Sequence, residues 1–255
     1  MRITSRDNER WKTLRGLADS ERDRRAAGKT VLDGIHLLQA FTSAGGVPEL
    51  LVVSDSGQKR DEIAAFLQGA GPEVIEVPDA MFEQASTVAT PTGIMAVIAI
   101  PKTSAKLVGT CVVLDGVQDA GNVGSILRSA AAAGIQHAVL GVGSANAWSP
   151  RVLRAAMGAH FSMTVHDGVT IASALADFQG AILTTEAQAS HTIYDTNLTG
   201  DVAWLIGNEG AGVSTEARAL ATGSVAIPIA EGTESLNAAA AAAICFFEQR
   251  RQRLK

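Results

Sequence analysis

Short apolar runs alternate with amphipathic segments along the first hundred residues of the chain. The apolar runs are typical of strands, and the segments with an apolar residue every three or four positions are typical of helices. We predict strands at residues 30–34, 49–55, 73–78 and 94–100, and helices around 10–29, 35–41, 60–67 and 79–86. Together these elements indicate a compact α/β unit.

A second alternating series follows the polar stretch PKTSAK at residues 101–106, which we interpret as a linker. Its predicted strands lie at 110–116, 137–142, 181–185 and 202–207, and its helices begin after Asn122, near Ser149 and after Ser235. Apolar strands separated by helices are typical of a mostly parallel sheet covered on both faces. We therefore predict an α/β protein with one domain at residues 1–100 and a second at 108–255.

Composition indicates a globular protein outside membranes. The chain has 255 residues, of which 47% are hydrophobic, so it can bury a large core. No stretch approaches the roughly 18 apolar residues of a membrane span, and the N-terminus lacks the apolar core of a secretion signal. Cys111 and Cys245 each lie in an apolar run, and neither they nor the histidines show metal-ligand spacing. We expect a cytoplasmic protein with buried thiols, no metal and no membrane partner.

Positive charge gathers at the N-terminus, although the whole chain has a net charge of −5. Residues 1–30 hold nine Lys or Arg against five Asp or Glu. The helix predicted there has an apolar stripe that should face the core, formed by Trp11, Leu14, Leu17 and Ala18. Its basic face is either a solvated surface with ion pairs or a surface that contacts RNA phosphates. For RNA contact the candidates are Arg22, Arg24 and Arg25.

Polar and glycine-rich loops follow several strands of the second series, where parallel sheets bind their ligands. One loop turns sharply at Asn122 into a helix that carries Arg128, and another has three glycines within residues 207–212 around Glu209. Glycine lets the backbone approach a ligand closely. A further loop, IPIAEGTESLN at 227–237, runs directly into six consecutive alanines.

Two common nucleotide-binding patterns do not fit these loops. Gly141 and Gly143 lack the third glycine of G-x-G-x-x-G, and no acidic residue ends the next strand at the usual distance. The triphosphate-binding pattern G-x-x-x-x-G-K-[ST] is absent from the sequence. We therefore do not expect a nicotinamide enzyme or a triphosphate hydrolase.

The segments NVGSILRSAAAAG, LIGNEGAGVS and IPIAEGTESLNAAAAAAI, in this order, resemble motifs one, two and three of the SpoU family of RNA ribose 2′-O-methyltransferases. The resemblance covers about residues 108–250. More loosely, ITSRDNERWKTLRGL, VLDGIHLLQAF and TPTGIMAV resemble the substrate-binding domain of the ribosomal-RNA branch of that family. The resemblance implies a deep trefoil knot in the second domain, involving residues 205–240, and a homodimer. It also implies that the smaller first domain binds RNA.

The resemblance further implies S-adenosylmethionine as cofactor and assigns site residues. Backbone groups at Thr184, Gly207, Ile227 and Leu236 would bind the cofactor. The ribose hydroxyl would be oriented and activated by Asn122, Arg128, Glu209, Ser235 and Asn237, with Arg128 supplied by the partner subunit. Because arginine stays charged, stabilisation of the developing alkoxide describes its role better than proton abstraction.

Two functions from different classes remain open. The first is S-adenosylmethionine-dependent 2′-O-methylation of structured RNA, and the second is RNA binding by a protein of this fold that has lost catalysis. The intact polar residues favour the enzyme. Ribosomal RNA is the expected substrate because the separate N-terminal domain is typical of that branch, with transfer RNA as the alternative.

Overall fold

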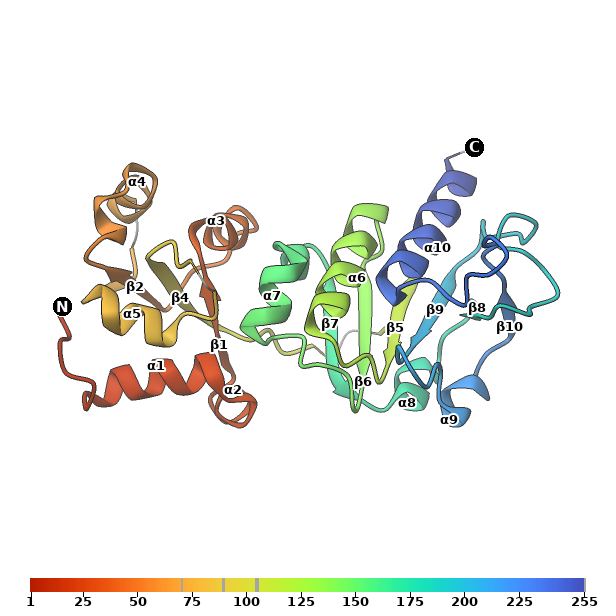
Figure 1. The fold of residues 1–255 in the computed structure, drawn as a ribbon, viewed down its shortest axis with the longest axis horizontal. Helices are drawn as coiled ribbons and strands as arrows, with labels where there is room; N and C mark the ends of the chain where they lie inside the picture. Colours follow the sequence, from red (N-terminus) through yellow and green to blue (C-terminus); the bar gives the residue numbers. More distant parts are fainter. Residues whose placement is uncertain (70, 89, 104–105, 255) are drawn as a thin grey trace. The chain divides into compact units, whose positions relative to one another are not determined.

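The structure is a computed structural model that describes residues 1–69, 71–88, 90–103 and 106–254. The chain forms two compact units, each with its own sheet (Figure 1). The first unit comprises residues 1–102 together with 148–161, and the second comprises the remainder. The predicted linker at 101–106 includes positions 104–105, which lie outside the described residues.

The sheet of the first unit is mixed. Its strands are β1 (Lys29–Asp33), β2 (Leu50–Ser54), β3 (Glu73–Val77) and β4 (Ile94–Ala99), in the order β1-β4-β2-β3. β2 and β3 are parallel, whereas β4 is antiparallel to both of its neighbours. The sequence predicts an α/β unit here, which the structure confirms, but the sequence does not give the direction of each strand. β4 is a central strand buried on both faces, and its continuous apolar run does not reveal its direction.

Helices cover both faces of this sheet. They are α1 (Glu9–Asp19), α2 (Glu21–Ala27), α3 (Ile35–Ser43), α4 (Asp61–Gln68) and α5 (Asp79–Ala85), with a 3₁₀ turn, η1, at Gly57–Lys59. The single helix predicted over 10–29 is two helices, because Ser20 adopts an extended conformation. Its hydroxyl accepts a hydrogen bond from the Asp23 amide at 3.2 Å, which caps the start of α2.

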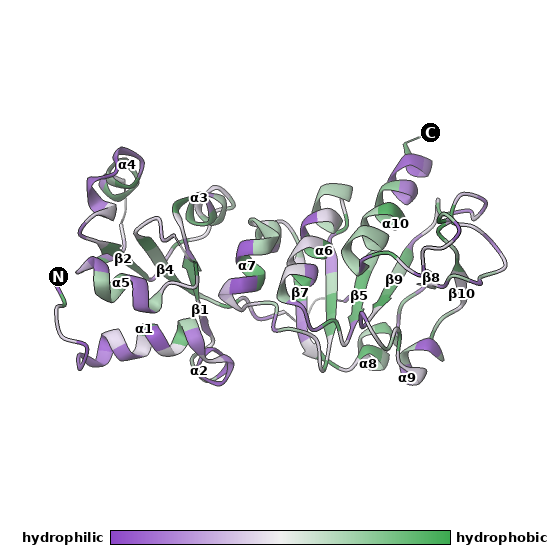
Figure 2. Ribbon diagram, viewed as in Figure 1, coloured by the Kyte–Doolittle hydropathy of each residue, from purple (hydrophilic) through white to green (hydrophobic). Residues whose placement is uncertain are grey.

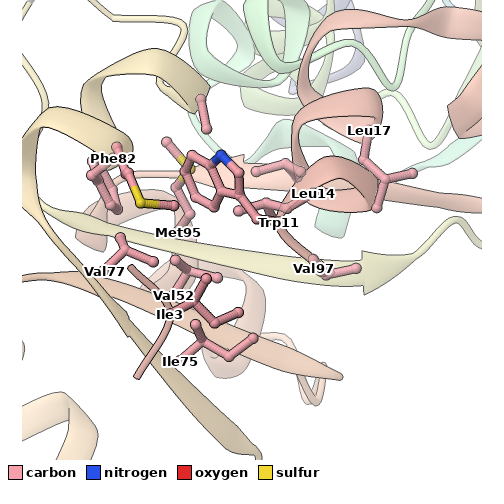
Figure 3. Close-up of a cluster of buried hydrophobic side chains, with 13 residues drawn as sticks. Ile3, Trp11, Leu14, Leu17, Val52, Ile75, Val77, Phe82, Met95 and Val97 are labelled. Atoms are coloured by element: carbon pink, nitrogen blue, oxygen red, sulfur yellow. The ribbon is translucent and has the colours of Figure 1, made fainter. Parts of the chain in front are cut away.

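Trp11 lies in the core of the first unit. It is 2% exposed and packs with Leu14 and Leu17 of α1 against the sheet and against Phe82 of α5 (Figure 3). Ala18 is buried as well. The apolar stripe predicted from the sequence is therefore confirmed.

Arg24 is also buried, although the sequence analysis predicts it on the basic surface. It is 5% exposed, and its Nη1 donates to the carbonyl oxygens of Leu17 at 3.0 Å and Ala18 at 3.3 Å. These carbonyls belong to the last turn of α1, where a cation is favourable and the helix leaves acceptors unpaired. Arg24 thus joins α2 to α1 and does not present its guanidinium to a ligand.

A segment from the middle of the chain completes the first unit. α7 (Pro150–Ala156) and the 3₁₀ turn η2 (Ala159–Phe161) belong to it, whereas the predicted boundaries assign both to the second domain. α7 packs on β1, and the Thr30 hydroxyl donates to the Trp148 carbonyl oxygen at 2.6 Å. This contact spans 118 residues, so local sequence patterns could not reveal it.

The sheet of the second unit is parallel throughout, as predicted. Its strands are β5 (Cys111–Asp115), β6 (His137–Gly141), β7 (Thr164–Val169), β8 (Ala181–Thr185), β9 (Val202–Gly207) and β10 (Gly223–Val225). Their order is β10-β8-β9-β5-β6-β7. The edge strands β7 and β10 were not predicted, because β7 is half polar and β10 has three residues.

Two layers of helices enclose this sheet. α6 (Ala120–Ala133) and α10 (Ala238–Arg253) pack side by side on one face, while α8 (Ile171–Leu175) and α9 (Thr215–Arg218) pack against strand residues of the other (Figure 1). The central strands β5 and β9 are hydrophobic along most of their length (Figure 2). Trp204 of β9 donates from its indole to Gln249 of α10 at 2.8 Å.

Both thiols are buried in this unit, as predicted. Burial raises the pKa of Cys111 to about 12, with a smaller contribution from the charge of Asp201. Burial likewise raises the pKa of Cys245 to about 12. Neither thiol therefore forms a reactive thiolate near neutral pH. Among the described helices, none is long and apolar enough to cross a membrane.

The buried position of Arg24 gives a test of the fold. Arg24→Ala should lower the free energy of unfolding by about 1–3 kcal/mol, because two buried carbonyl groups lose a charged donor. Arg22→Ala is the matched control, since Arg22 is 91% exposed and its loss should change stability by less than about 0.5 kcal/mol. Urea denaturation curves measure both. Equal stability of the two variants would contradict the assigned contact.

Candidate functional site

Two adjoining cavities open at the carboxyl ends of β8 and β9 in the second unit. The larger has a volume of ≈ 370 Å³ and the smaller ≈ 150 Å³. Thr185, Ser235, Leu236 and Ala241 line both. Gly207 lines the larger cavity, Ile227 the smaller and Leu236 both, so three of the four residues predicted to bind the cofactor lie on these walls.

The loop after β9 is held closed by Asn208. Its backbone exchanges two hydrogen bonds with Gly212, each at 2.9 Å. Its side-chain oxygen accepts the amides of Gly210 and Ala211, and its Nδ2 donates to the Gly116 carbonyl oxygen after β5, all at 2.9 Å. The loop is thus fixed to the neighbouring strand end.

Gly207 has no room for a side chain. A Cβ at this position would lie 2.2 Å from the carbonyl carbon of Gly212. Gly210, in the same loop, is different, because its Cβ would meet only the Asn208 side chain, at 3.6 Å. The close approach of the two backbone segments therefore requires glycine at 207 and not at 210.

A chain of three polar side chains connects three segments of the sequence. Asn122 Nδ2 donates to Glu209 Oε1 at 2.9 Å, and Asn237 Nδ2 donates to Asn122 Oδ1 at 2.9 Å. These contacts span 87 and 115 residues. The structure therefore brings together three of the five residues predicted to act on the ribose, and Ser235 lies two positions before Asn237 on the cavity wall.

Asn237 also begins the terminal helix. Its Oδ1 accepts the amides of Ala239 at 2.9 Å and Ala240 at 3.3 Å, which is the geometry of a helix N-cap. The alanines that follow lie where α10 packs on α6, and Ala242 is fully buried. Small side chains let the two helices approach closely, so the first turn of α6 and the N-terminus of α10 meet beside Glu209.

The Glu209 carboxylate is stabilised in its charged form. Burial acts to raise its pKa, but hydrogen bonds from the Asn122 side chain and from backbone groups of Glu209, Asp119 and Gln118 outweigh that effect. The net result is a pKa below the ordinary value. Glu209 therefore carries a negative charge at the cavity wall at neutral pH.

Sequence analysis missed several residues of the cavity walls. Thr185 is the last residue of β8 and Glu186 follows it, and Arg218 of α9 forms an ion pair with Glu186. Thr184, predicted as a cofactor contact, is buried in β8 and donates its hydroxyl to Glu186 at 3.1 Å. The position of Thr185 at a strand end could have identified it. Arg218 lies on a four-residue helix and carries no such signal.

Arg128 is exposed on α6, six residues beyond Asn122. Within the described residues, neither cavity is lined by Arg128. In the first unit, Arg22 and Arg25 are exposed, and Arg25 pairs with Glu21 at 2.7 Å. Arg24 is buried and leaves this surface.

Comparison with known proteins gives consistent matches along the chain. The sequence model of the SpoU rRNA Methylase family matches residues 109–247, and that of the MRM3-like substrate binding domain matches residues 8–96. An uncharacterized tRNA/rRNA methyltransferase of Synechocystis sp. is 30% identical over 98% of this chain and 93% of its own length. The 23S rRNA (guanosine(2553)-2′-O)-methyltransferase of Bacillus subtilis is 29% identical over 94% of both chains.

Solved structures agree with the sequence matches. The crystal structure of the SpoU methyltransferase AviRb from Streptomyces viridochromogenes, in complex with the cofactor AdoMet, superposes with a TM-score of 0.89. Its sequence is 25% identical, and the match covers 97% of this chain and 99% of that chain.

The bond between Asn122 and Glu209 can be tested by titration. Asn122→Ala should raise the pKa of Glu209, because the strongest of the hydrogen bonds that lower it is lost. Because the pKa of Glu209 is lower in the folded than in the unfolded state, its ionisation stabilises the fold at pH values above the unfolded-state pKa. This stabilisation is lost as the pH falls through the folded-state pKa. Carboxyl ¹³C NMR measures the shift, with Ser125→Ala on the exposed side of α6 as control. An unchanged Glu209 pKa in Asn122→Ala would refute the contact.

Proposed function

This chain belongs to the SpoU rRNA methylase family, and on that premise we propose that it transfers a methyl group from S-adenosylmethionine to a ribose 2′-hydroxyl of ribosomal RNA. The resemblance drawn from the three sequence motifs is therefore confirmed at the level of the family. The observation that carries the proposal is the chain of hydrogen bonds from Glu209 through Asn122 to Asn237 beside a glycine-bounded cavity.

The cavity walls fit S-adenosylmethionine. Backbone at Gly207, Ile227 and Leu236 is available to the adenine and ribose, and Glu209 places a carboxylate at the wall, whereas the Glu186 carboxylate is paired with Arg218. Carboxylates favour a cationic sulfonium and disfavour a triphosphate. When bound, the cofactor supplies an electrophilic methyl group.

The residues around the cavity have to orient the acceptor hydroxyl and accommodate its charge. Because Glu209 is held ionised, it can accept a hydrogen bond from a ribose hydroxyl, and Asn122 and Asn237 fix its position. Ser235 adds a hydroxyl at the same wall. Positioning of this kind supplies much of the rate when the methyl group is already electrophilic.

We assign Arg128 to the cavity of a second subunit. It is exposed and lines neither cavity of its own chain among the described residues, so a homodimer would let it contribute to the partner's site. There its charge would stabilise the developing alkoxide, while the hydroxyl proton passes to water or to an RNA phosphate oxygen and S-adenosylhomocysteine is the leaving group. The deep trefoil knot belongs to the same proposal. It is supported by the path of the chain from the edge strand β10 through residues 226–237 to α10, which packs on α6 and β9.

The first unit is proposed to hold the RNA. Arg22 and Arg25 remain as phosphate contacts, and the match to a substrate binding domain over residues 8–96 supports ribosomal RNA over transfer RNA. The cytoplasmic location remains a prediction, because relatives include bacterial enzymes and mitochondrial ones. An RNA-binding protein without catalysis is the remaining alternative, and loss of transfer in the experiments below would support it.

Cofactor binding can be tested with two glycine variants of one loop. Gly207→Ala should weaken S-adenosylmethionine binding by about tenfold or more, because relieving a backbone clash costs about 1–3 kcal/mol. Gly210→Ala should bind normally, since its Cβ meets no backbone. Isothermal titration calorimetry measures both. The proposal fails if the unaltered protein shows no binding, and the assigned loop fails if the two variants behave alike.

Arg128→Ala tests catalysis and the shared site. Single-turnover methyl transfer should fall by roughly 10² or more, while cofactor affinity stays nearly unchanged. Mixing Arg128→Ala with Gly207→Trp, whose large side chain should abolish cofactor binding, should then restore part of the activity, because one site of each heterodimer combines an intact arginine with an intact cofactor loop. Native mass spectrometry must first show the heterodimers. Their presence without recovered activity would mean that Arg128 acts within its own chain.

A further inference from the structure

A third cavity lies within the first unit, separate from the methyl-transfer site. Its volume is ≈ 160 Å³, and it is bounded by the turn from β1 to α3, the loop before β4, and α7. Its walls include Asp33, Ile35, Val88, Thr92, Arg154 and Met157. The proposed methylation reaction makes no use of these residues.

Asp33 brings an unpaired acceptor to this cavity. The residue is 8% exposed, and its Oδ2 accepts the Ser86 hydroxyl at 2.8 Å and the Thr87 amide at 3.0 Å. Its Oδ1 is buried and has no hydrogen-bond partner in the described structure. The same holds for the hydroxyl of Thr92. Because a buried unpaired polar group costs about 1–3 kcal/mol, such groups indicate a partner that arrives from outside.

The Asp33 carboxyl group shares this cavity with the positively charged side chain of Arg154. Burial raises the pKa of Asp33, and the bonds from Ser86 and Thr87 together with the charge of Arg154 offset only part of that rise. Arg154 on α7 is therefore near enough to act on Asp33, and it supplies hydrogen-bond donors where Asp33 supplies an acceptor. The cavity thus offers both kinds of polar contact.

The remaining walls are mainly apolar, with His36 and Thr90 as further polar residues. Ile35 is buried, Val88 precedes β4 in the sequence, and Met157 at the C-cap of α7 is 53% exposed. A ligand that fits has apolar faces and an edge carrying both donors and acceptors. An unstacked nucleobase has this form, and proteins that bind single-stranded RNA recognise bases through such edges.

We propose that this cavity binds one unpaired nucleobase of the RNA substrate, with Asp33 Oδ1 accepting a hydrogen bond from an exocyclic amino group and with Thr92 and Arg154 contacting the rest of the edge. Uracil is disfavoured, because its N–H lies between two carbonyl oxygens that would face the carboxylate. The inference rests on the proposed action on RNA and adds that the first unit reads a base as well as phosphates.

Asp33→Asn distinguishes recognition of a base from a simple effect of charge. Removing a carboxylate from an RNA-binding surface should strengthen RNA binding. Asp61→Asn, at an exposed position of the same unit, should show that effect. Asp33→Asn should instead weaken binding of amino-bearing bases. The Ser86 hydroxyl and the Thr87 amide donate to Oδ2, so the amide oxygen of the variant would stay there and its NH₂ group would take the place of Oδ1. The two variants make the same change in charge and are expected to shift affinity in opposite directions.

The experiment uses the full chain and fluorescent RNA heptamers in fluorescence anisotropy. Oligouridine is compared with heptamers that carry adenosine, cytidine or guanosine at the centre. At least one amino-bearing base should bind about tenfold more tightly than uridine, and both Asp33→Asn and Thr92→Val should remove this preference. Thr92→Val decides the question if Asp33→Asn does not fold, as judged by thermal denaturation.

Equal affinity for all heptamers would overturn the inference, as would stronger binding by Asp33→Asn that matches Asp61→Asn. Calorimetry with S-adenosylmethionine distinguishes this failure from failure of the proposed function. Normal cofactor binding without base preference removes only the base-binding cavity, whereas absent cofactor binding removes the methyltransferase proposal itself.

Discussion

The hydrogen bonds that join Glu209, Asn122 and Asn237 are the contacts on which the candidate site depends. They connect the loop after β9, the first turn of α6 and the N-terminus of α10, which are far apart in the sequence. Asn237 has a second task, since its side chain caps α10. Loss of the Asn237 side chain would therefore disturb both the start of that helix and the position of Asn122, which donates to the Glu209 carboxylate.

The parallel sheet makes this meeting possible. Because every strand of the second unit runs in the same direction, the loops that follow β5, β8 and β9 emerge at one edge. The alanines of α10 then allow that helix to lie close against α6, which brings Asn237 within reach of Asn122. Gly207 permits the last close approach, between the end of β9 and Gly212.

Much of this architecture could be predicted from the sequence. The buried stripe of α1, the strands of both sheets other than β7 and β10, and the loops of the candidate site follow from local patterns. Motif resemblance identified Asn122, Glu209 and Asn237, and the structure places them in contact. The roles assigned to them in methyl transfer remain predictions.

What the sequence did not reveal depends on contacts between distant residues. Arg24 has the sequence pattern of a surface cation, but its guanidinium donates to carbonyl oxygens in the last turn of α1. The direction of β4 depends on its neighbours, and α7 joins the first unit through a contact between Thr30 and Trp148. The cavity around Asp33 combines three separate segments, so no local pattern could indicate it.

In the proposed reaction, one site built from two subunits places a methyl group on a ribose oxygen. The most direct test incubates the protein with ribosomal RNA and S-adenosylmethionine carrying a deuterated methyl group, and then locates the label by mass spectrometry of the nucleosides. We predict a single labelled nucleoside with the methyl group on its 2′-oxygen. A label on a base, or no label on RNA in the presence of bound cofactor, would contradict the proposed reaction.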